Sequence, residues 1–365
     1  MTHFHIRHIE DVLPHIDGRS DFIHVERDGY SVIDYVYVLP DSFAHPARVE
    51  CRGIKFAPDG SVLARPLHKF RNIGEAECTQ PNKLDFSRPH TIMEKLDGSM
   101  IHTAVIDENP VFMTRMGRTD HARIAERHLS PALREWCLKN QEVTPIFEWT
   151  APDNRIVVRY DESALTLLAA RCNTTGAYMN AAEVADATGV PLVRHFEPCH
   201  SSAAEFLEFA REVQGSEGFV VRLESGVWVK AKGDDYVLKH RAKDSILQEK
   251  NILSLVLTGG LDDVLPLLDE ADAQSARDYA SQVEAGILAS ADEISSLVAA
   301  NDSIGQKEFA LSVAASLPRQ IRSLAFLVRG GADPKEAVRA AIIASTTSQT
   351  RVDDCRMLHG ARWAA

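Results

Sequence analysis

The chain contains 365 residues, 45% of them apolar, and carries a formal net charge of −12. A chain of this size can bury a full core and is expected to form two domains. No apolar run approaches the length of a membrane-spanning helix, so we expect no membrane partner. The acidic total argues against a nucleic-acid partner unless the basic residues are gathered locally.

The charged residues are distributed unevenly. Residues 52–71 contain five basic side chains and one acidic one, and residues 309–365 contain eight basic and four acidic side chains. Between residues 262 and 308 the balance reverses, with eleven acids and two bases. This segregation permits a local phosphate-binding surface on an acidic protein.

Six cysteines are scattered along the chain without a Cys-x-x-Cys pair. The pattern indicates neither a zinc site nor a disulfide framework. We therefore expect buried, reduced thiols in a cytoplasmic protein, either bacterial or made by a phage in its host. The cysteines are Cys51, Cys78, Cys137, Cys172, Cys199 and Cys355.

Up to about residue 243 the sequence predicts mostly strands, separated by turns and a few helices. Strands are expected at residues 30–38, 52–56, 62–67, 146–150, 165–171, 219–223 and 226–232. Helices are expected at residues 123–140, 180–188 and 203–213, from the spacing of their apolar side chains. Asp59-Gly60 marks a tight hairpin turn. Strands and helices without a βαβ rhythm predict an α+β fold with antiparallel sheets.

Beyond residue 243 the pattern changes to amphipathic helices. Asp244 is expected to cap a helix, and residues 273–300 form a long Ala-rich amphipathic segment. Asp333 and Pro334 supply an N-cap and a first-turn proline for another helix. The predicted domains are therefore residues 1–243 and an all-helical domain of residues 244–365.

The stretch Lys95-Leu96-Asp97-Gly98-Ser99 lies between two apolar runs. Asp-Gly is a strong tight-turn signal, so the stretch is compatible with an ordinary β-hairpin. The alternative is that Lys95 is a nucleophile that attacks the α-phosphate of a nucleotide and retains the AMP as a phosphoramidate. A lysine reacts in this way only without its proton, so it needs burial or neighbouring cations.

Five other stretches bear on this choice. Arg52 precedes a glycine at a strand start, where its guanidinium can face phosphate oxygens or simply lie on the surface. Lys69 lies in a basic stretch that is otherwise an ordinary loop. Glu148 lies in an apolar strand, so its carboxylate must be satisfied by ribose hydroxyls or by a buried arginine.

The last two stretches contain Glu217 and a pair of lysines. Glu217 precedes a glycine, where it can face a divalent metal or remain a solvated acid beside a turn. Strand alternation puts Lys230 and Lys232 on one face. Two neighbouring ammonium groups repel each other, so a phosphate is a natural partner, although alternating lysines are also common on solvated strands. Each stretch alone favours its ordinary interpretation. The order of the stretches along the chain does not favour that interpretation.

In chain order the stretches read Glu-Cys-Arg-Gly-Ile, Arg-Pro-x-x-Lys-Phe, Lys-x-Asp-Gly-Ser, Phe-Glu-Trp-x-Ala-Pro-x-Asn-Arg-Ile-Val, Glu-Gly-Phe-Val and Lys-x-Lys-x-Asp-x-Tyr. This order resembles that of the covalent nucleotidyltransferases. The details resemble the bacteriophage RNA ligase 1 family of ATP-dependent tRNA-repair ligases over roughly residues 30–243. Trp149 and Phe219 stand where that family has Phe and Tyr.

The resemblance implies a nucleotidyltransferase (adenylyltransferase) domain of antiparallel sheets with flanking helices, followed by an all-α domain. It implies an ATP-dependent RNA ligase that transfers AMP from Lys95 to an RNA 5′-phosphate, after which a 3′-OH seals the strand and expels AMP. The implied cofactors are ATP and Mg²⁺, with Mn²⁺ as the alternative cation. The expected partner is RNA with 5′-phosphate and 3′-OH ends, such as a nicked tRNA anticodon loop in tRNA repair. We expect a monomer.

Catalytic roles follow from the resemblance for five residues. Lys95 is the implied nucleophile, and Lys230 and Lys232 are the implied contacts of the α-phosphate. Glu217 would carry or orient the metal. Arg52 would contact a phosphate of the nucleotide or of the RNA end.

Binding roles are implied for six further residues. Lys69 would contact a phosphate and Glu148 the ribose, while Asp97 and Gly98 would shape the nucleophile loop. Arg115 is a candidate for triphosphate contact, since Thr114-Arg115-Met116-Gly117 stands where the family has Lys-Ser-Lys-Gly. Val220 completes the set of implied nucleotide-binding residues.

Two alternatives and one hypothesis accompany this interpretation. A DNA ligase or mRNA capping enzyme normally appends an OB-fold after the Lys-x-Lys motif, so the helical tail argues against both. A non-catalytic nucleotide- or RNA-binding module conflicts with the intact lysines and Glu217. We hypothesise that the helical domain selects a structured RNA through the basic segment Arg319–Arg362, with an ordinary solvated helix face as the alternative.

Overall fold

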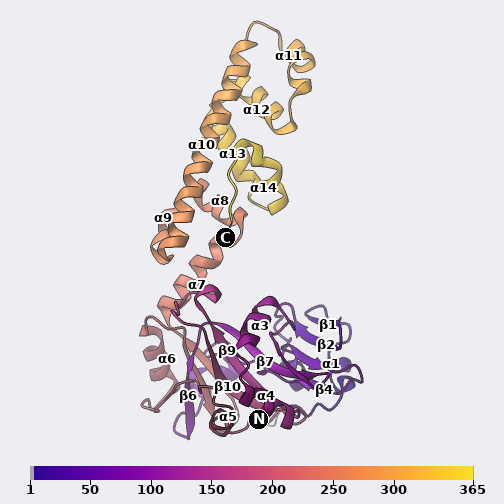
Figure 1. Cartoon of the computed structure of the whole chain (residues 1–365). Helices are drawn as coiled ribbons and strands as arrows, with labels where there is room; N and C mark the ends of the chain where they lie inside the picture. The colour runs from indigo at the N-terminus through magenta and orange to yellow at the C-terminus, as the bar shows by residue number, and fades with distance from the viewer. Residues whose placement is uncertain (1–3, 365) are drawn as a thin grey trace. The chain divides into compact units, whose positions relative to one another are not determined.

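In the computed structural model of the protein, which describes residues 4–364, the chain divides into two compact units, Met1–Val237 and Leu238–Ala365. The first unit contains antiparallel sheets with flanking helices, and the described part of the second contains helices without strands (Figure 1). The α+β prediction is therefore confirmed. Among the described residues, none of the helices is both long and apolar enough to cross a membrane.

Three sheets build the first unit. The first sheet has the order β1 (Phe22–Arg27), β2 (Tyr30–Tyr35), β3 (Ile54–Phe56) and β4 (Val62–Ala64). The second has the order β10 (Ala164–Cys172), β9 (Val143–Thr150), β7 (Ser99–Ile106) and β8 (Asn109–Met113). The third has the order β11 (His195–Phe196), β6 (His90–Lys95), β12 (Gly218–Leu223), β13 (Trp228–Lys232) and β5 (Arg71–Asn72). Among the strands described, β13 and β5 form the only parallel pair.

Helices cover the outer faces of the second and third sheets. The helices of this unit are α1 (Leu13–Ile16), α2 (Pro46–Glu50), α3 (Asp120–Ala125), α4 (Pro131–Lys139), α5 (Ala181–Thr188) and α6 (Ala203–Glu212). One buried cluster joins α4 and α5 to the second sheet, and another joins α6 to the third. A third cluster, which includes Met93, Ile146 and Trp228, packs the inner faces of these two sheets against each other. The candidate site lies beside this inter-sheet layer.

Two local predictions for the first unit have different outcomes. The hairpin turn at Asp59-Gly60 is confirmed, because it joins the antiparallel strands β3 and β4. The single helix predicted for residues 123–140 is wrong. Pro131 cannot continue a preceding helix, so α3 ends at Ala125 and α4 starts afresh with Ser130 as its N-cap.

The second unit is organised along the long helix α10 (Glu270–Ala300) (Figure 1). Its other helices are α8 (Glu249–Thr258), α9 (Leu261–Val264), α11 (Gln306–Ser312), α12 (Arg319–Arg329), α13 (Pro334–Ser345) and α14 (Gln349–Cys355). One buried cluster, which includes Ile252, Ile287 and Ile342, runs through the unit. The cap predicted at Asp333 is confirmed, since its carboxylate accepts a hydrogen bond from the N–H of Glu336 at 2.9 Å.

The cap predicted at Asp244 is wrong. Helix α7 (Asp234–Ile246) runs through this residue, and α8 begins only at Glu249. Asp244 instead lies 3.0 Å from the ring of His240 on the same helix. An aspartate one turn beyond a histidine is satisfied by that side chain, so the charge does not have to mark a helix start.

The expectation of buried thiols holds for only part of the cysteines. Cys51 and Cys137 are buried, whereas Cys78 and Cys199 are exposed and the other two are intermediate. All six are free thiols. The absence of paired spacing in the sequence correctly indicated no disulfide framework, but it carried no information on exposure.

Candidate active site

Lys95 ends β6, and the turn after it leads into another sheet. Strand β6 pairs with β11 and β12, whereas β7, which begins at Ser99, pairs with β8 and β9. The hairpin interpretation of Asp97-Gly98 is therefore wrong, because the flanking strands do not pair with each other. Gly98 is required by a close approach, since a Cβ atom there would lie 2.3 Å from the carbonyl oxygen of Trp149.

Asp97 is buried and fixes this loop. Its carboxylate accepts hydrogen bonds from the N–H groups of Val157 and Val158, both at 2.7 Å, and from the hydroxyl of Tyr236 at 2.6 Å. Tyr236 is the tyrosine of the Lys-x-Lys-x-Asp-x-Tyr stretch, and its hydroxyl thus bonds to the nucleophile loop. The contacts of Asp97 also explain why the Lys-x-Asp-Gly stretch lies against the segment after β9. Asp97 therefore shapes the loop and does not itself line the cavity described below.

The sheet register brings three charged side chains together. Gly218 at the start of β12 pairs with Lys95 on one side and with Lys232 on the other. The neighbouring Glu217 is buried, and its two carboxylate oxygens lie 2.5 Å from Nζ of Lys95 and 2.9 Å from Nζ of Lys232. One carboxylate thus holds two lysines at the end of the third sheet.

A cavity of about 240 Å³ adjoins Lys95. Six of the predicted site residues line it, and these are Lys95, Arg52, Gly98, Glu148, Val220 and Lys230. Its wall also includes Glu94 and apolar side chains such as Leu67 and Phe70. The cavity therefore combines cations, carboxylates and apolar surface, as a site for a charged molecule with an aromatic part requires.

Burial and neighbouring charge shift the protonation of two residues that line the cavity. Burial, reinforced by the ammonium groups of Lys95, Lys69 and Lys232, lowers the pKa of Lys230 to about 8. Burial also raises the pKa of Glu148 to about 7, against the opposing effect of Lys95. Both groups therefore change charge near neutral pH, which is typical of functional sites.

Glu148 also contacts the nucleophile loop. Its carboxylate accepts a hydrogen bond from the N–H of Gly98 at 3.2 Å. No buried arginine is bonded to it among the described contacts. The arginine that the sequence left as an alternative partner for this carboxylate is therefore not seen, and a cavity-facing acid remains.

Two predicted site residues lie beside Tyr35 and do not line the cavity. Nζ of Lys69 lies 5.2 Å from the ring centre of Tyr35 and 5.5 Å from that of Phe43. The guanidinium of Arg115 lies 4.5 Å from the Tyr35 ring centre, and its Nε donates to Asp34 at 2.7 Å. Lys69 and Arg115 thus both lie against the ring of Tyr35, the last residue of β2 in the first sheet.

Sequence reasoning missed Lys55, which is fully buried. Its ammonium donates to the carbonyl oxygens of Gly53 at 2.6 Å, Thr114 at 2.8 Å and Arg115 at 3.0 Å, and burial moves its pKa well below the usual value. Lys55 therefore fastens the Arg-Gly stretch to the loop that carries Arg115. Its place three residues after Arg52, within an apolar strand, was the available signal.

The basic stretch 52–71 is consequently not one open phosphate-binding surface. Lys55 and Arg65 are fully buried and bond to protein groups, and Arg71 pairs within the third sheet as part of β5. Of the five basic side chains in this stretch only Arg52 lines the cavity, while Lys69 lies beside Tyr35. Counting charges along the chain could not distinguish these positions.

Comparisons with known proteins find similarity to RNA ligases. A sequence model of an RNA ligase family matches residues 50–247, more than half of the chain. A putative RNA ligase of Thermovibrio ammonificans is 27% identical over 308 residues, which cover 79% of this chain and 80% of that protein. RNA ligase 1 of bacteriophage TS2126 is 26% identical over 216 residues, 56% of this chain and 55% of that protein. Among solved structures, an archaeal ATP-dependent RNA ligase is similar over 64% of each chain, with 18% identity and a TM-score of 0.48.

Proposed function

The chain belongs to the bacteriophage RNA ligase 1 family of RNA ligases, and on this premise we propose that it joins RNA ends with ATP through a covalent lysyl-AMP at Lys95. The observation that carries the proposal is that Glu217 bonds to both Lys95 and Lys232, while Lys95 and Lys230 line one cavity. A nucleophile, a carboxylate and two further cations are what phosphoryl transfer to a lysine requires.

The proposed reaction has three steps. The neutral amine of Lys95 attacks the α-phosphorus of ATP, forms an N–P bond and releases pyrophosphate. An RNA 5′-phosphate oxygen then displaces Lys95 and takes the AMP as a 5′-5′ pyrophosphate. Finally a 3′-OH attacks the 5′-phosphate of that end, forms the phosphodiester bond and expels AMP.

The cavity residues supply charge in these steps. We assign Lys230 and Lys232 to the α-phosphate, where their charge neutralises the transition state. Arg52, which lines the same cavity, and Lys69, close enough to lower the pKa of Lys230, are assigned to other phosphates. Glu148 is assigned to the ribose hydroxyls, because an ionised carboxylate accepts their hydrogen bonds.

The donor set fits a divalent cation that is held in part by phosphate. The described residues contain no group of three or more His, Cys, Asp or Glu side chains placed to hold a metal ion. Mg²⁺ commonly binds through one or two carboxylates together with substrate phosphates, and Glu217 offers such a carboxylate beside Lys95. The bound cation would supply neutralisation of phosphate charge. We propose Mg²⁺, with Mn²⁺ as the alternative.

The finer details of the substrate belong to the same proposal. We propose a nicked tRNA anticodon loop as the natural RNA, a monomeric enzyme that works in the cytoplasm, and an RNA-selecting role for residues 244–365. Five of the eight basic residues in 309–365 already bond to protein groups, and these are Arg322, Arg329, Arg339, Arg351 and Arg356. The exposed Arg319, Lys335 and Arg362 are the remaining candidates for RNA contact.

The test separates the steps of the reaction. Wild type and Lys95→Ala are incubated with ATP, Mg²⁺ and a 5′-phosphorylated RNA, and in parallel with RNA that already carries the 5′-adenylate. The proposal predicts that Lys95→Ala fails to join the first substrate but retains joining of the pre-adenylated RNA. Joining of the 5′-phosphorylated RNA by Lys95→Ala would overturn the covalent role. A protein that joins DNA ends equally well would favour the DNA-ligase alternative.

A further inference from the structure

The segment 65–70 builds part of the cavity wall without belonging to a strand or a helix. It joins β4 to β5, and Leu67 and Phe70 from this segment line the cavity next to Lys95. Lys69, proposed above as a phosphate contact, lies between them. A segment without a hydrogen-bonded ladder needs other contacts to keep its side chains in place. Tertiary contacts must therefore hold this part of the cavity wall.

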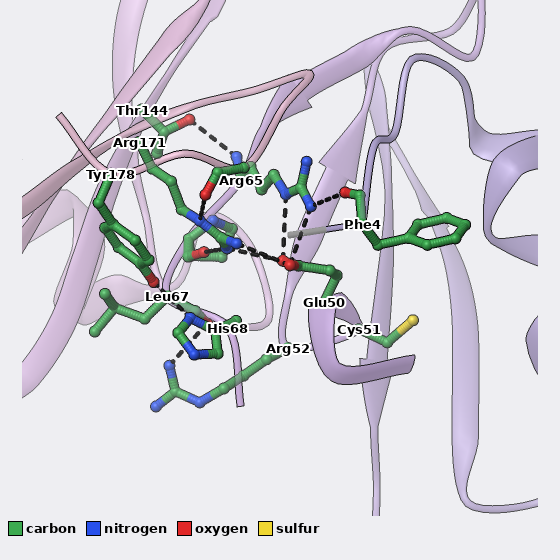
Figure 2. Close-up of polar contacts among 12 residues, drawn as sticks. Phe4, Glu50, Cys51, Arg52, Arg65, Leu67, His68, Thr144, Arg171 and Tyr178 are labelled. Carbon is green, nitrogen blue, oxygen red and sulfur yellow. Dashed lines mark hydrogen bonds and ion pairs between the residues drawn. The ribbon is translucent and has the colours of Figure 1, made fainter. Parts of the chain in front are cut away.

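A buried carboxylate beneath the segment gathers two arginines (Figure 2). The carboxylate oxygens of Glu50, at the end of α2, lie 3.1 and 3.2 Å from nitrogens of Arg65. They also lie 2.8 Å from both terminal nitrogens of Arg171 on β10. The two guanidinium groups are fully buried, and the side chain of Glu50 is only 2% exposed. One carboxylate thus joins α2, the cavity-wall segment and the second sheet.

The remaining donors of both arginines bond to backbone carbonyl groups. Arg65 donates to the carbonyl oxygen of Phe4 at 2.5 Å and to that of Thr174 at 2.9 Å. Arg171 donates to the carbonyl oxygens of Gly176 and Pro66, both at 2.8 Å. A buried guanidinium is stable only when its donors are satisfied. The second of the Arg171 contacts reaches the cavity-wall segment directly.

A second chain of contacts runs from Arg171 to His68. The guanidinium of Arg171 lies 4.8 Å from the ring centre of Tyr178, whose hydroxyl is 2.7 Å from Nδ1 of His68 (Figure 2). The backbone N–H of Lys69 donates to the carbonyl oxygen of Val49 at 2.8 Å. Together with Arg65, Pro66 and the carbonyl of Leu67, these contacts bind each residue from 65 to 69 to the surrounding protein.

Glu50 is also coupled to Arg52. Only one residue separates them, and the N–H of Arg52 donates to the carbonyl oxygen of Glu50 at 2.7 Å. The guanidinium of Arg52 in turn donates to the carbonyl oxygen of Leu67 at 3.4 Å. The carboxylate therefore sits between the two stretches that carry proposed phosphate contacts.

We propose that Glu50 is a positioning residue of the nucleotide site, which, through Arg65, Arg171 and the Tyr178–His68 contact, holds Arg52 and the 65–70 cavity wall where they meet ATP. The inference rests on the proposed function, because it takes ATP as the ligand of the cavity. None of the network residues except Arg52 and Leu67 lines the cavity, so the network acts through the residues that do.

The main test replaces Glu50 and measures two quantities in the full-length protein. Glu50→Gln removes the charge between two buried guanidinium groups while keeping the side-chain shape. The half-saturating ATP concentration for Lys95 adenylylation is expected to rise about tenfold or more, since small displacements of binding groups have effects of this size. The rate at saturating ATP is expected to change far less. A folded Glu50→Gln protein with an unchanged half-saturating concentration would overturn the proposal.

Glu249→Gln is the matched control. Glu249 is also buried and arginine-paired, with Arg356 nitrogens at 2.6 and 2.7 Å, but it belongs to the helical unit. It should leave the half-saturating ATP concentration unchanged. An equal rise in both variants would assign the Glu50 effect to general destabilisation and overturn the positioning role.

Tyr178→Phe tests the network with a milder change, which keeps the test decisive if Glu50→Gln fails to fold. It removes only the hydroxyl that contacts His68. We expect a rise of about threefold in the half-saturating ATP concentration, and no rise would overturn the proposal for this arm of the network. ATP binding is also measured by equilibrium dialysis with Lys95→Ala and with Lys95→Ala/Tyr178→Phe. That comparison measures ATP binding directly, so it gives a result even if no covalent transfer occurs. Failure of the proposed function and failure of the positioning role are thereby distinguished.

Discussion

Each of the two units contains a buried glutamate that gathers arginine, yet the surroundings of the two clusters differ. Glu50 pairs with Arg65 and Arg171 beneath a segment that lines the cavity. Glu249 pairs with Arg356 and also accepts a hydrogen bond from the N–H of Trp363, near the end of the chain. A buried glutamate–arginine cluster thus holds a cavity wall in one unit, and a cluster of the same kind holds the segment around Trp363 in the other. A buried glutamate–arginine cluster does not by itself indicate a function. The residues around the cluster indicate whether it supports a site or only the fold.

The largest expected difference between the units concerns Glu217. Glu217→Gln removes the negative charge that lies between Lys95 and Lys232, so both lysines lose their shared partner. Because Glu217 is also the carboxylate proposed to hold the divalent cation that neutralises phosphate charge, we expect the rate of Lys95 adenylylation to fall about 100-fold or more. Single-turnover transfer of label from ATP measures this rate. Glu249→Gln is the control in the other unit, and a comparable loss there would remove the distinction between the two carboxylates.

The next largest effect concerns the stability of the helical unit. Glu249→Gln removes the buried carboxylate that pairs with Arg356 and leaves this guanidinium with the more exposed Asp353 as its remaining charged partner. We expect the free energy of unfolding to fall by about 3 kcal/mol, as for other broken buried pairs. Urea denaturation followed by circular dichroism measures the change. A loss well under 1 kcal/mol would show that the cluster is not a stability element.

The pH dependence of the half-saturating ATP concentration tests two residues that line the cavity. Below about pH 7 Glu148 becomes neutral and loses its capacity to accept two ribose hydrogen bonds as a carboxylate. Above about pH 8 Lys230 loses its charge and with it the attraction to phosphate. The half-saturating ATP concentration should therefore be lowest between these values and rise on both sides.

Glu148→Gln provides the control for that pH dependence. It should remove the rise on the acidic side and leave the alkaline side in place, because only the second depends on Lys230. If the acidic limb survives in Glu148→Gln, another group is responsible for it.

The smallest expected effect concerns RNA selection by the helical unit. The combined change Arg319→Ala, Lys335→Ala and Arg362→Ala removes three exposed charges. We expect joining of a nicked tRNA to fall a few-fold at physiological salt, with joining of short single strands unchanged, because each phosphate contact contributes a modest, salt-dependent share of affinity. Equal loss on both substrates would speak against selection by this unit.

The sequence predicted the parts of the site that are defined by local patterns. The alternation of Lys230 and Lys232 could be recognised because it requires a particular residue type at a fixed spacing, whereas the Asp97-Gly98 signal indicated a hairpin that does not form. The pairing of β6 and β7 in different sheets could not be recognised, since a strand pattern does not state its partner. The buried positions of Lys55 and Arg65 were missed for a similar reason, because a charge looks the same on a surface and in a core until its bonding partners are known.

The most direct test of the central claim is incubation of the full-length protein with α-labelled ATP and Mg²⁺, followed by denaturing electrophoresis and peptide mapping. Lys83→Ala, which changes an exposed lysine outside the site, is compared with Lys95→Ala. We expect acid-labile label on wild type and Lys83→Ala, mapped to the peptide that contains Lys95, and none on Lys95→Ala. Label retained by Lys95→Ala, or no label on wild-type protein shown to be free of bound AMP, would contradict the covalent role of Lys95.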